Sequence, residues 1–245
     1  MKIVFFGVGA VCSVMATLLD ELSNKSKQKD INFVFVVRNI KKAQDHFFKN
    51  SNVLNKSDFL EIKHFEEIFE DSKKYEKYLQ NSDIFINSST PSFNLPIMNL
   101  ALKYNTNYAD LASDIYKDEI ISTLKFDQQN LENEFKYKNL FALINLGISP
   151  GITNFLIGEK IHSLKNLPYE VKIKKLEINL LEEIQSKKLI FSWSPKVAID
   201  ELAFPPVFYK KNKPKTIEPF SKSKVYKFPY FRNIVDIYPV FQEEL

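Results

Sequence analysis

Glycine is scarce in this chain, and its placement constrains the fold more than any other feature. Only five glycines occur in 245 residues, whereas soluble proteins average about 7% glycine. Four of the five fall in two short segments, Gly7 with Gly9 and Gly147 with Gly151. Glycine is kept where the backbone needs a positive φ or where another group approaches closely. These two segments therefore mark the special backbone sites of the chain.

The first glycine pair stands between a predicted strand and a predicted helix. Residues 3–6 are a continuous apolar run, typical of a strand buried on both faces of a parallel sheet. Residues 11–22 carry apolar side chains at helical spacing. A strand, a glycine turn and a helix in this order predict a dinucleotide-binding fold, with the pyrophosphate at the helix N-terminus. The predicted cofactor contacts in this segment are Gly7, Gly9, Ala10 and Val11.

The third position of the glycine motif, usually glycine or alanine, is Cys12. That position serves close packing of the helix on the strand, and cysteine is small enough for it. We expect Cys12 to be a buried small apolar side chain, since free cysteine usually behaves that way. The motif is weakened by this change, and its support comes from its place directly after the first strand.

The end of the second predicted strand bears on the type of dinucleotide. Residues 31–37 are another apolar run, and Arg38 follows them. No acidic residue stands there to accept the ribose hydroxyls of NAD, whereas an arginine could pair with the 2′-phosphate of NADP. Arg38 is one of two arginines among 34 basic residues. We therefore predict NADP in preference to NAD, with Arg38 as a contact.

Two further predicted strands, residues 83–87 and 107–110, end in polar residues. The carboxyl ends of parallel strands line the ligand crevice in such folds, so these side chains are candidates for contacts. Turn formation is the alternative role at the end of the first strand, and helix capping is the alternative at the end of the second. The candidate cofactor contacts are Asn87, Ser88 and Ser89, and the candidate substrate contacts are Asp110 and Ser113.

The second glycine pair repeats the first pattern. Residues 140–146 predict a buried strand, and a helix is predicted from the loop at Gly151 to about residue 164. Residues 94–104 and 118–138 have the apolar spacing of helices. From residue 171 the pattern changes to alternating strands such as residues 172–178, which predicts an α+β domain with an open antiparallel sheet.

Composition limits the class of protein. A 44% share of hydrophobic residues excludes disorder. The net charge is +4, and lysines alternate with acidic residues along the whole chain. A nucleic-acid-binding protein would instead cluster its basic residues on one face. A single cysteine, the lack of an apolar run of ~20 residues and an N-terminus without a signal-peptide pattern predict a cytoplasmic protein that does not associate with a membrane. The scattered histidines predict no metal site, and no nucleophile arrangement identifies catalytic residues.

Several segments together resemble the saccharopine dehydrogenase-like superfamily, of the saccharopine reductase and carboxynorspermidine synthase type. They occur in the family's order along almost the whole chain. The resemblance implies an α/β fold: a Rossmann-like, doubly wound parallel sheet over residues 1–165, then an incomplete α+β substrate and dimerisation domain over residues 166–245. The matching segments are residues 6–11, 86–93, 107–112, 147–154, 191–195 and 236–240.

The resemblance also implies an activity, in which a homodimer transfers a hydride between NADP and the imine or secondary-amine carbon of an amino-acid-derived substrate. A dicarboxylate substrate calls for a cationic anchor, and Arg232 is the best candidate because of its forked guanidinium; surface solvation is the alternative. Family members are longer and return to the Rossmann domain, so we expect this chain to be C-terminally truncated. A catalytically silent nucleotide-binding or interaction protein, and a fragment that needs a separate C-terminal partner, are the alternatives.

Overall fold

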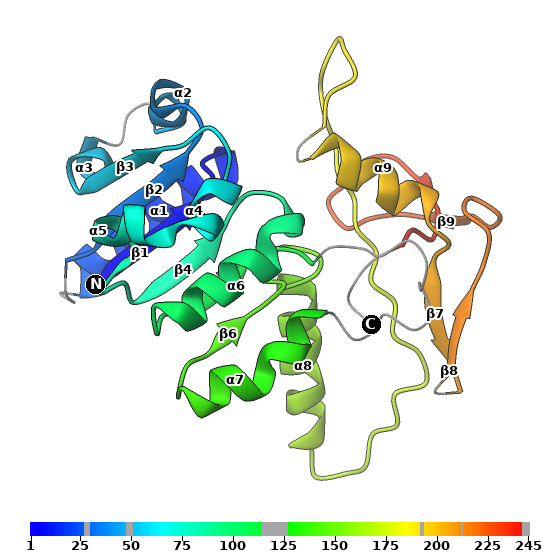
Figure 1. Ribbon diagram of the computed structural model, residues 1–245. Helices are drawn as coiled ribbons and strands as arrows, with labels where there is room; N and C mark the ends of the chain where they lie inside the picture. Colours follow the sequence, from blue (N-terminus) through cyan, green and yellow to red (C-terminus); the bar gives the residue numbers. More distant parts are fainter. Residues whose placement is uncertain (27–29, 48–50, 114–126, 192–193, 212, 242–245) are drawn as a thin grey trace. The chain divides into compact units, whose positions relative to one another are not determined.

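The computed structural model describes residues 1–26, 30–47, 51–113, 127–191, 194–211 and 213–241 (Figure 1). The first part of the predicted helix over residues 118–138 and residues 192–193 of a family segment lie outside this part. The chain divides into two units. Unit 1 is Met1–Ile115 with Lys125–Gly147, and unit 2 is Tyr116–Leu124 with Ile148–Leu245. This division differs from the proposed domain boundary after residue 165, because it assigns helix α8 (Ile152–Lys165) to unit 2.

The described residues of unit 1 form one sheet of six strands in the order β3-β2-β1-β4-β5-β6 (Figure 1). Every neighbouring pair in it is parallel. The order runs outward in both directions from β1, which confirms the predicted Rossmann-like, doubly wound sheet. The strands are β1 (Lys2–Phe6), β2 (Asn32–Val37), β3 (Ser57–Glu61), β4 (Ile84–Asn87), β5 (Asn107–Asp110) and β6 (Ala142–Leu143).

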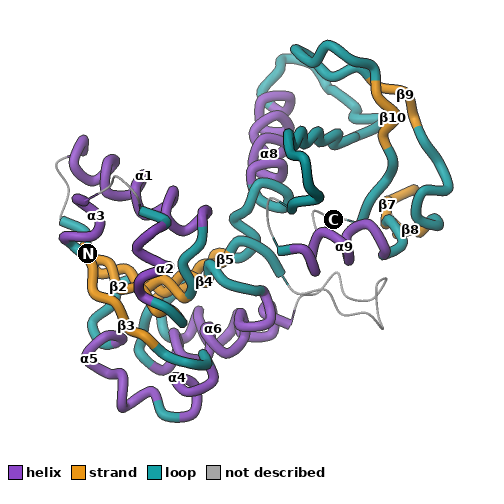
Figure 2. Tube along the Cα trace, turned by 90° about the horizontal axis from the view of Figure 1, so that it is seen from above, coloured by secondary structure: helices purple, strands orange, loops and turns teal. Residues whose placement is uncertain are grey.

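Helices cover both faces of this sheet. Figure 2 shows α1 and α3 on one side of the strands and α4, α5 and α6 on the other, as the two buried clusters also require. The α-helices are α1 (Ala10–Ser26), α2 (Ile40–Asp45), α3 (Ser51–Asn55), α4 (Glu66–Glu70), α5 (Glu76–Leu79), α6 (Asn94–Lys103) and α7 (Glu132–Tyr137). Short 3₁₀ helices are η1 (Ser72–Tyr75), η2 (Pro91–Phe93) and η3 (Asp127–Leu131).

The core of unit 1 is built from alternate residues of the central strands. Phe5 points into the cluster that α1, α2 and α3 cover, whereas Phe6 points into the cluster on the opposite face. Both side chains are fully buried. The ring of Phe5 stacks on that of Phe35 with centroids 5.6 Å apart, and the ring of Phe6 meets Phe85 edge-on at 5.5 Å. A strand buried on two faces needs the continuous apolar run that the sequence carries.

Helix α1 turns a different face to the sheet than its apolar spacing predicts. Its buried residues are Cys12, Ser13, Ala16, Asp20 and Ser23. The residues of its apolar stripe that stay more than half exposed are Val11, Val14, Leu18 and Leu22. Small side chains let the helix lie close to the strands, which accounts for the buried alanine, serines and cysteine.

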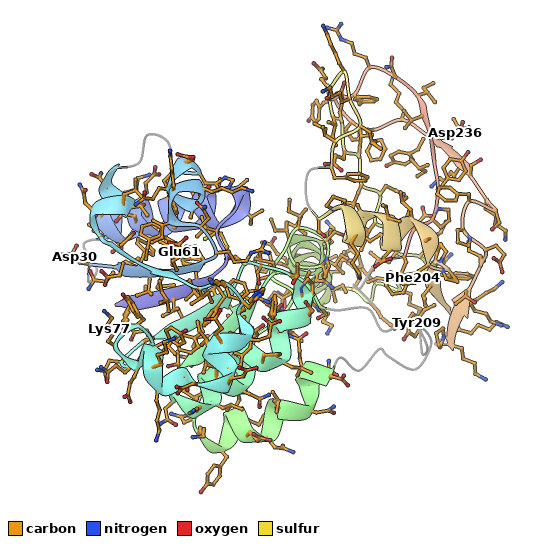
Figure 3. The ribbon with its side chains drawn as sticks, turned by 45° about the horizontal axis from the view of Figure 1, so that its top comes forward. Asp30, Glu61, Lys77, Phe204, Tyr209 and Asp236 are labelled. Carbon is orange, nitrogen blue, oxygen red and sulfur yellow. The ribbon has the colours of Figure 1, made fainter. Side chains whose placement is uncertain are left out.

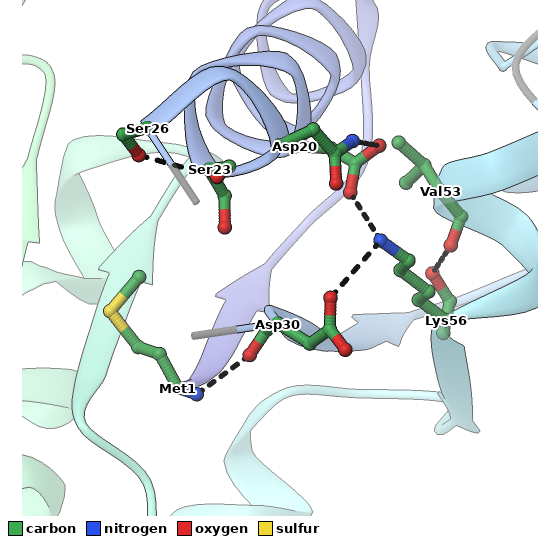
Figure 4. A network of polar contacts seen from close by, with 9 residues as sticks. Met1, Asp20, Ser23, Ser26, Asp30, Val53 and Lys56 are labelled. Atoms are coloured by element: carbon green, nitrogen blue, oxygen red, sulfur yellow. Dashed lines mark hydrogen bonds and ion pairs between the residues drawn. The ribbon is translucent and has the colours of Figure 1, made fainter. Parts of the chain in front are cut away.

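The buried acid of α1 is paired, which is why it can lie on that face. Lys56, directly before β3, places its Nζ 3.0 Å from an oxygen of Asp20 and 3.8 Å from an oxygen of Asp30 (Figure 4). The N-terminal amine of Met1 donates to the backbone oxygen of Asp30 over 2.8 Å. A buried carboxylate without such a partner would be strongly destabilising. This network fixes α1 across one end of the sheet.

Unit 2 has less regular structure. Helix α9 is Pro195–Ala203, and the strands form two antiparallel pairs, β7 (Val207–Lys210) with β8 (Lys213–Thr216) and β9 (Lys224–Tyr226) with β10 (Val235–Ile237). Tyr209 and Asp236 on these hairpins are exposed (Figure 3). Helix α8 ends within one residue of its predicted end and, among the residues described, buries none of its side chains.

The predicted strand over residues 172–178 does not form. The chain from residue 171 to residue 191 has neither helix nor strand. Leu176 and Ile178, which the alternation would place on one buried face, are 60% and 39% exposed. An alternating segment becomes a strand only where another strand supplies hydrogen bonds and another layer covers its apolar side.

Within the described part of the chain, no helix is long and apolar enough to cross a membrane.

Candidate functional site

Gly7 ends β1 in a conformation that only glycine adopts readily. Its φ is +93°, and its amide donates to the carbonyl of Val36 on β2 over 2.9 Å. A Cβ added at Gly7 would lie 2.8 Å from the Cβ of Ser89 and 3.2 Å from the backbone of the same residue. The turn after β1 therefore packs directly against the turn after β4. Glycine is needed here for both the backbone angle and the space.

Gly9 stands at the start of α1 and faces open space. A Cβ added there would meet no atom within 4 Å. The first backbone bond of the helix runs from the amide of Ser13 to the carbonyl of Gly9 over 3.0 Å. The amides of Ala10 and Val11 precede that bond, and both residues are exposed. A helix N-terminus with exposed amides beside a side-chain-free residue fits a phosphate group.

Cys12 is buried, as we expected from the degraded glycine motif. Burial raises the pKa of its thiol to about 12, although a contact with Ser88 acts in the opposite direction. A thiol in this state is neutral at ordinary pH, so Cys12 is not a nucleophile. It packs between helix and strand, where the usual motif has glycine or alanine.

Arg38 follows β2 at the same edge of the sheet. The register pairs Val36 of β2 with Phe6 of β1, so Arg38 lies close to the end of β1 and to its glycine turn. Its side chain is exposed, and its neighbour Asn39 caps α2 by accepting from the amide of Lys42 over 2.8 Å. The cap fixes the backbone next to Arg38. A cation held at this place suits a phosphate on the adenosine ribose.

The turn after β4 is tied to the glycine turn. The Ser88 amide donates to the carbonyl of Phe6 over 3.1 Å, and its hydroxyl donates to the carbonyl of Gly7 over 2.8 Å. The amide and hydroxyl of Ser89 both donate to Oδ1 of Asn87, over 3.0 Å and 2.6 Å. Ser88 and Ser89 are half-buried at the carboxyl end of β4, whereas Asn87 is buried and shapes the turn.

Asn87 continues into a buried polar network that sequence reasoning did not identify. Its Nδ2 donates to Oδ1 of Asn94 over 2.7 Å, and the Tyr108 hydroxyl donates to the same oxygen over 3.1 Å. The Nδ2 of Asn94 donates to the carbonyl of Ala112 over 2.8 Å. Asn94 is the first residue of α6. The one signal in the sequence was an asparagine on the apolar side of a predicted helix.

Asp110 and Ser113 lie at the end of β5 and are both buried. Asp110 accepts from the amide of Asn145 over 2.7 Å and from the side-chain amide of Gln128. The Ser113 hydroxyl lies 2.8 Å from the side-chain oxygen of Gln128. Burial raises the pKa of Asp110 to about 6, while its hydrogen bonds with Asn145, Tyr108 and Gln128 act to lower it. Burial also raises the pKa of Tyr108.

The structure thus brings most of the predicted site residues to one edge of the unit 1 sheet. They gather at the carboxyl ends of β1, β2, β4 and β5. Arg232 lies in unit 2 and is exposed. Among the residues that the structure places, no three His, Cys, Asp or Glu side chains are grouped so that they could hold a metal ion.

A family model identifies the domain that carries these residues. Residues 3–143, more than half of the chain, match the saccharopine dehydrogenase NADP binding domain. The chain belongs to the saccharopine dehydrogenase family. Its cofactor is NADP, as Arg38 and the missing acidic residue predict. The residues present fit this cofactor, because Gly9 leaves open the space in front of the first amides of α1.

One solved structure supports the fold, and a second is similar over part of the chain. A saccharopine dehydrogenase (L-Glu forming) from Saccharomyces cerevisiae aligns over 98% of this chain and 49% of its own, with 17% identity and a TM-score of 0.63. Shikimate dehydrogenase from Mycobacterium tuberculosis aligns over 68% of this chain and 52% of its own, with 11% identity and a TM-score of 0.40. The chain thus spans about half the length of either protein. No curated protein matches it by sequence.

Proposed function

We propose that this chain is an NADP-dependent oxidoreductase of the saccharopine dehydrogenase type, which transfers a hydride at the imine or secondary-amine carbon of an amino-acid-derived substrate. The observation that carries the proposal is the NADP-binding domain over residues 3–143, with Gly7 and Gly9 in the turn before α1. The substrate class is taken from the yeast saccharopine dehydrogenase that shares the fold.

The residues after β1 and β2 would hold the adenosine and phosphate end of the cofactor. Backbone amides at the start of α1 would donate to the pyrophosphate, and the guanidinium of Arg38 would pair with the 2′-phosphate. Ser88 and Ser89 would contact the half of the cofactor that carries the nicotinamide. The residues assigned to cofactor binding are Gly7, Gly9, Ala10, Val11, Arg38, Ser88 and Ser89, and Asn87 shapes the turn that carries the two serines.

NADP supplies the hydride chemistry when bound, and the chain supplies binding and orientation. Asp110 ends β5 and Ser113 lies in the loop after it. Since both are buried and bonded inside unit 1, we assign them the task of holding the loop after β5. Arg232 would hold a substrate carboxylate through its fork of N–H donors. A homodimer in the cytoplasm is the expected state of the enzyme, on the strength of the family resemblance and the single cysteine.

The proposal is tested by cofactor binding and turnover on the purified chain. NADPH should quench intrinsic fluorescence or gain fluorescence of its own on binding, and NADH should bind more weakly. Incubation with NADP⁺ and saccharopine should then form NADPH, followed by absorbance. Failure to bind NADPH at millimolar concentration would overturn the proposal. Binding without turnover of any secondary-amine amino acid would leave a nucleotide-binding protein without catalysis.

A second candidate is a cofactor-binding subunit that acts with a separate polypeptide. The exposed apolar side chains of unit 2 favour it, since Phe155 and Ile148 are both 71% exposed. Apolar patches of this kind mark surfaces that another chain covers. Turnover that appears only after another polypeptide is added would support this candidate over the first.

A further inference from the structure

Asn94 lies where three parts of unit 1 meet. It is 3% exposed and begins α6, although its side chain makes no cap for that helix. Its oxygen accepts from Asn87 over 2.7 Å and from Tyr108 over 3.1 Å, and its nitrogen donates to the carbonyl of Ala112 over 2.8 Å. Both ends of one amide group are therefore used, and its orientation is fixed.

On one side, Asn94 governs the turn that faces the cofactor. With its nitrogen held by Asn94 and by the carbonyl of Thr90 (3.1 Å), Asn87 must direct its oxygen toward Ser89. Ser89 is the residue that a Cβ added at Gly7 would meet, at 2.8 Å from its own Cβ. A rotated Asn87 amide would present N–H groups to the donors of Ser89, and the turn would lose both bonds.

On the other side, Asn94 reaches the loop after β5. Its bond to the carbonyl of Ala112 holds the residue just before Ser113, whose hydroxyl is 2.8 Å from Gln128. Tyr108 also contacts Asp110, which accepts from the amide of Asn145. One buried side chain thus joins the turn after β4 to the loop after β5.

We propose that Asn94 is a positioning residue that sets the Ser88–Ser89 turn and the loop at Ala112 in register with each other. The inference rests on the proposed function, since it concerns the same NADP site. Asn94 touches neither cofactor nor substrate in this account and acts through Asn87 and the Ala112 carbonyl. A buried side-chain amide fixes the geometry around it when all of its hydrogen bonds are formed, and a partly satisfied amide does not.

The test is an NADPH titration of the full chain and three variants, below the midpoint of thermal unfolding. Asn94→Ala should weaken NADPH binding about 10-fold, which corresponds to one or two hydrogen bonds. Tyr108→Phe, which keeps the ring and two of the Asn94 bonds, should weaken it by less than about 3-fold. Asn99→Ala, an exposed asparagine of the same helix, should leave binding unchanged. A merely structural role would lower the unfolding midpoint without changing the affinity of the folded protein.

Hydrogen exchange of the wild-type chain and of Asn94→Ala gives a second measurement. NADPH should slow amide exchange at residues 88–89 and at residues 112–113 together, and Asn94→Ala should remove the second effect. Exchange that slows at residues 88–89 alone in the wild type, or an Asn94→Ala variant with wild-type affinity, would overturn the inference. If the wild-type chain does not bind NADPH, the proposed function fails first and the inference falls with it.

Discussion

The two units of this chain treat their apolar side chains in opposite ways. Unit 1 buries them on both faces of one parallel sheet, and among the residues described only Pro150, Pro206 and Phe241 are buried in unit 2. The described residues of unit 2 form two hairpins and two helices, and side chains such as Phe155 and Leu189 stay largely exposed. Burial of apolar area is the main favourable term in folding. Unit 1 therefore contributes most of the favourable free energy of folding. The site that we assign to NADP is built from unit 1 alone.

Separating the units should give the largest effect. Residues 1–147 should unfold in one cooperative thermal transition, with a midpoint close to that of the full chain, because they retain both buried clusters. Residues 148–245 should show no cooperative transition. Circular dichroism against temperature measures both. A sharp transition in the isolated second segment would contradict the comparison.

Asp110 should make the stability of unit 1 depend on pH. Burial raises its pKa from the ordinary 3.8 to about 6 in the folded state. The folded state then holds the proton more tightly, so the stabilisation is complete below 3.8 and is lost as pH rises through about 6. This loss amounts to about 3 kcal/mol.

Asp110→Asn removes that titration. Urea unfolding at several pH values should show the wild type losing stability relative to the variant as pH rises across this window. Parallel pH profiles for the two proteins would show that Asp110 does not titrate in this way.

Gly7 and Gly9 offer a matched pair of substitutions. Gly7→Ala should destabilise unit 1 by about 1–3 kcal/mol, because a side chain at a φ of +93° is strained and meets Ser89. Gly9→Ala should change stability by less than about 0.5 kcal/mol, since its Cβ would meet nothing. Both variants should bind NADPH more weakly. Equal stability losses in the two variants, measured by urea unfolding, would contradict the described geometry of the turn.

Substitutions on the two faces of α1 should differ in their effect on the free energy of unfolding. The exposed face should give the smallest change, and the buried face supplies the control. Leu18→Gln should change the free energy of unfolding by less than about 0.5 kcal/mol, because Leu18 is exposed. Ala16→Leu, on the fully buried face, should cost about 1–3 kcal/mol through overpacking. Urea midpoints measure both. A large loss for Leu18→Gln would show that something covers this stripe in solution.

The parts of the fold that could be predicted are those governed by neighbours in the sequence. The apolar run before Gly7 predicted β1, and the glycine itself predicted the turn after it. The face of α1 could not be read from apolar spacing, because a distant lysine, Lys56, stabilises the buried Asp20. The strand over residues 172–178 failed because its pattern needs a neighbouring strand and a covering layer.

The candidate site divides in the same way. Strand ends located Arg38 and the Ser88–Ser89 turn at one edge of the sheet, since the carboxyl ends of parallel strands all lie on one side. The role of Asn94 depends on contacts with Tyr108 and Ala112, which lie 14 and 18 residues further along the chain. Spacing within one helix carries no information about such partners. A buried hydrogen-bond network is visible only once the strands are arranged.

The central claim, that unit 1 is an NADP-binding unit organised around the turn at Gly7 and Gly9, is tested most directly by titrating the wild-type chain and Arg38→Ala with NADPH and with NADH. The account predicts that the wild type binds NADPH more tightly than NADH. It also predicts that Arg38→Ala loses about 10-fold or more in affinity for NADPH and keeps its affinity for NADH, because only NADPH carries the 2′-phosphate. Wild-type protein that binds neither nucleotide, or an Arg38→Ala variant that loses both equally, would contradict it.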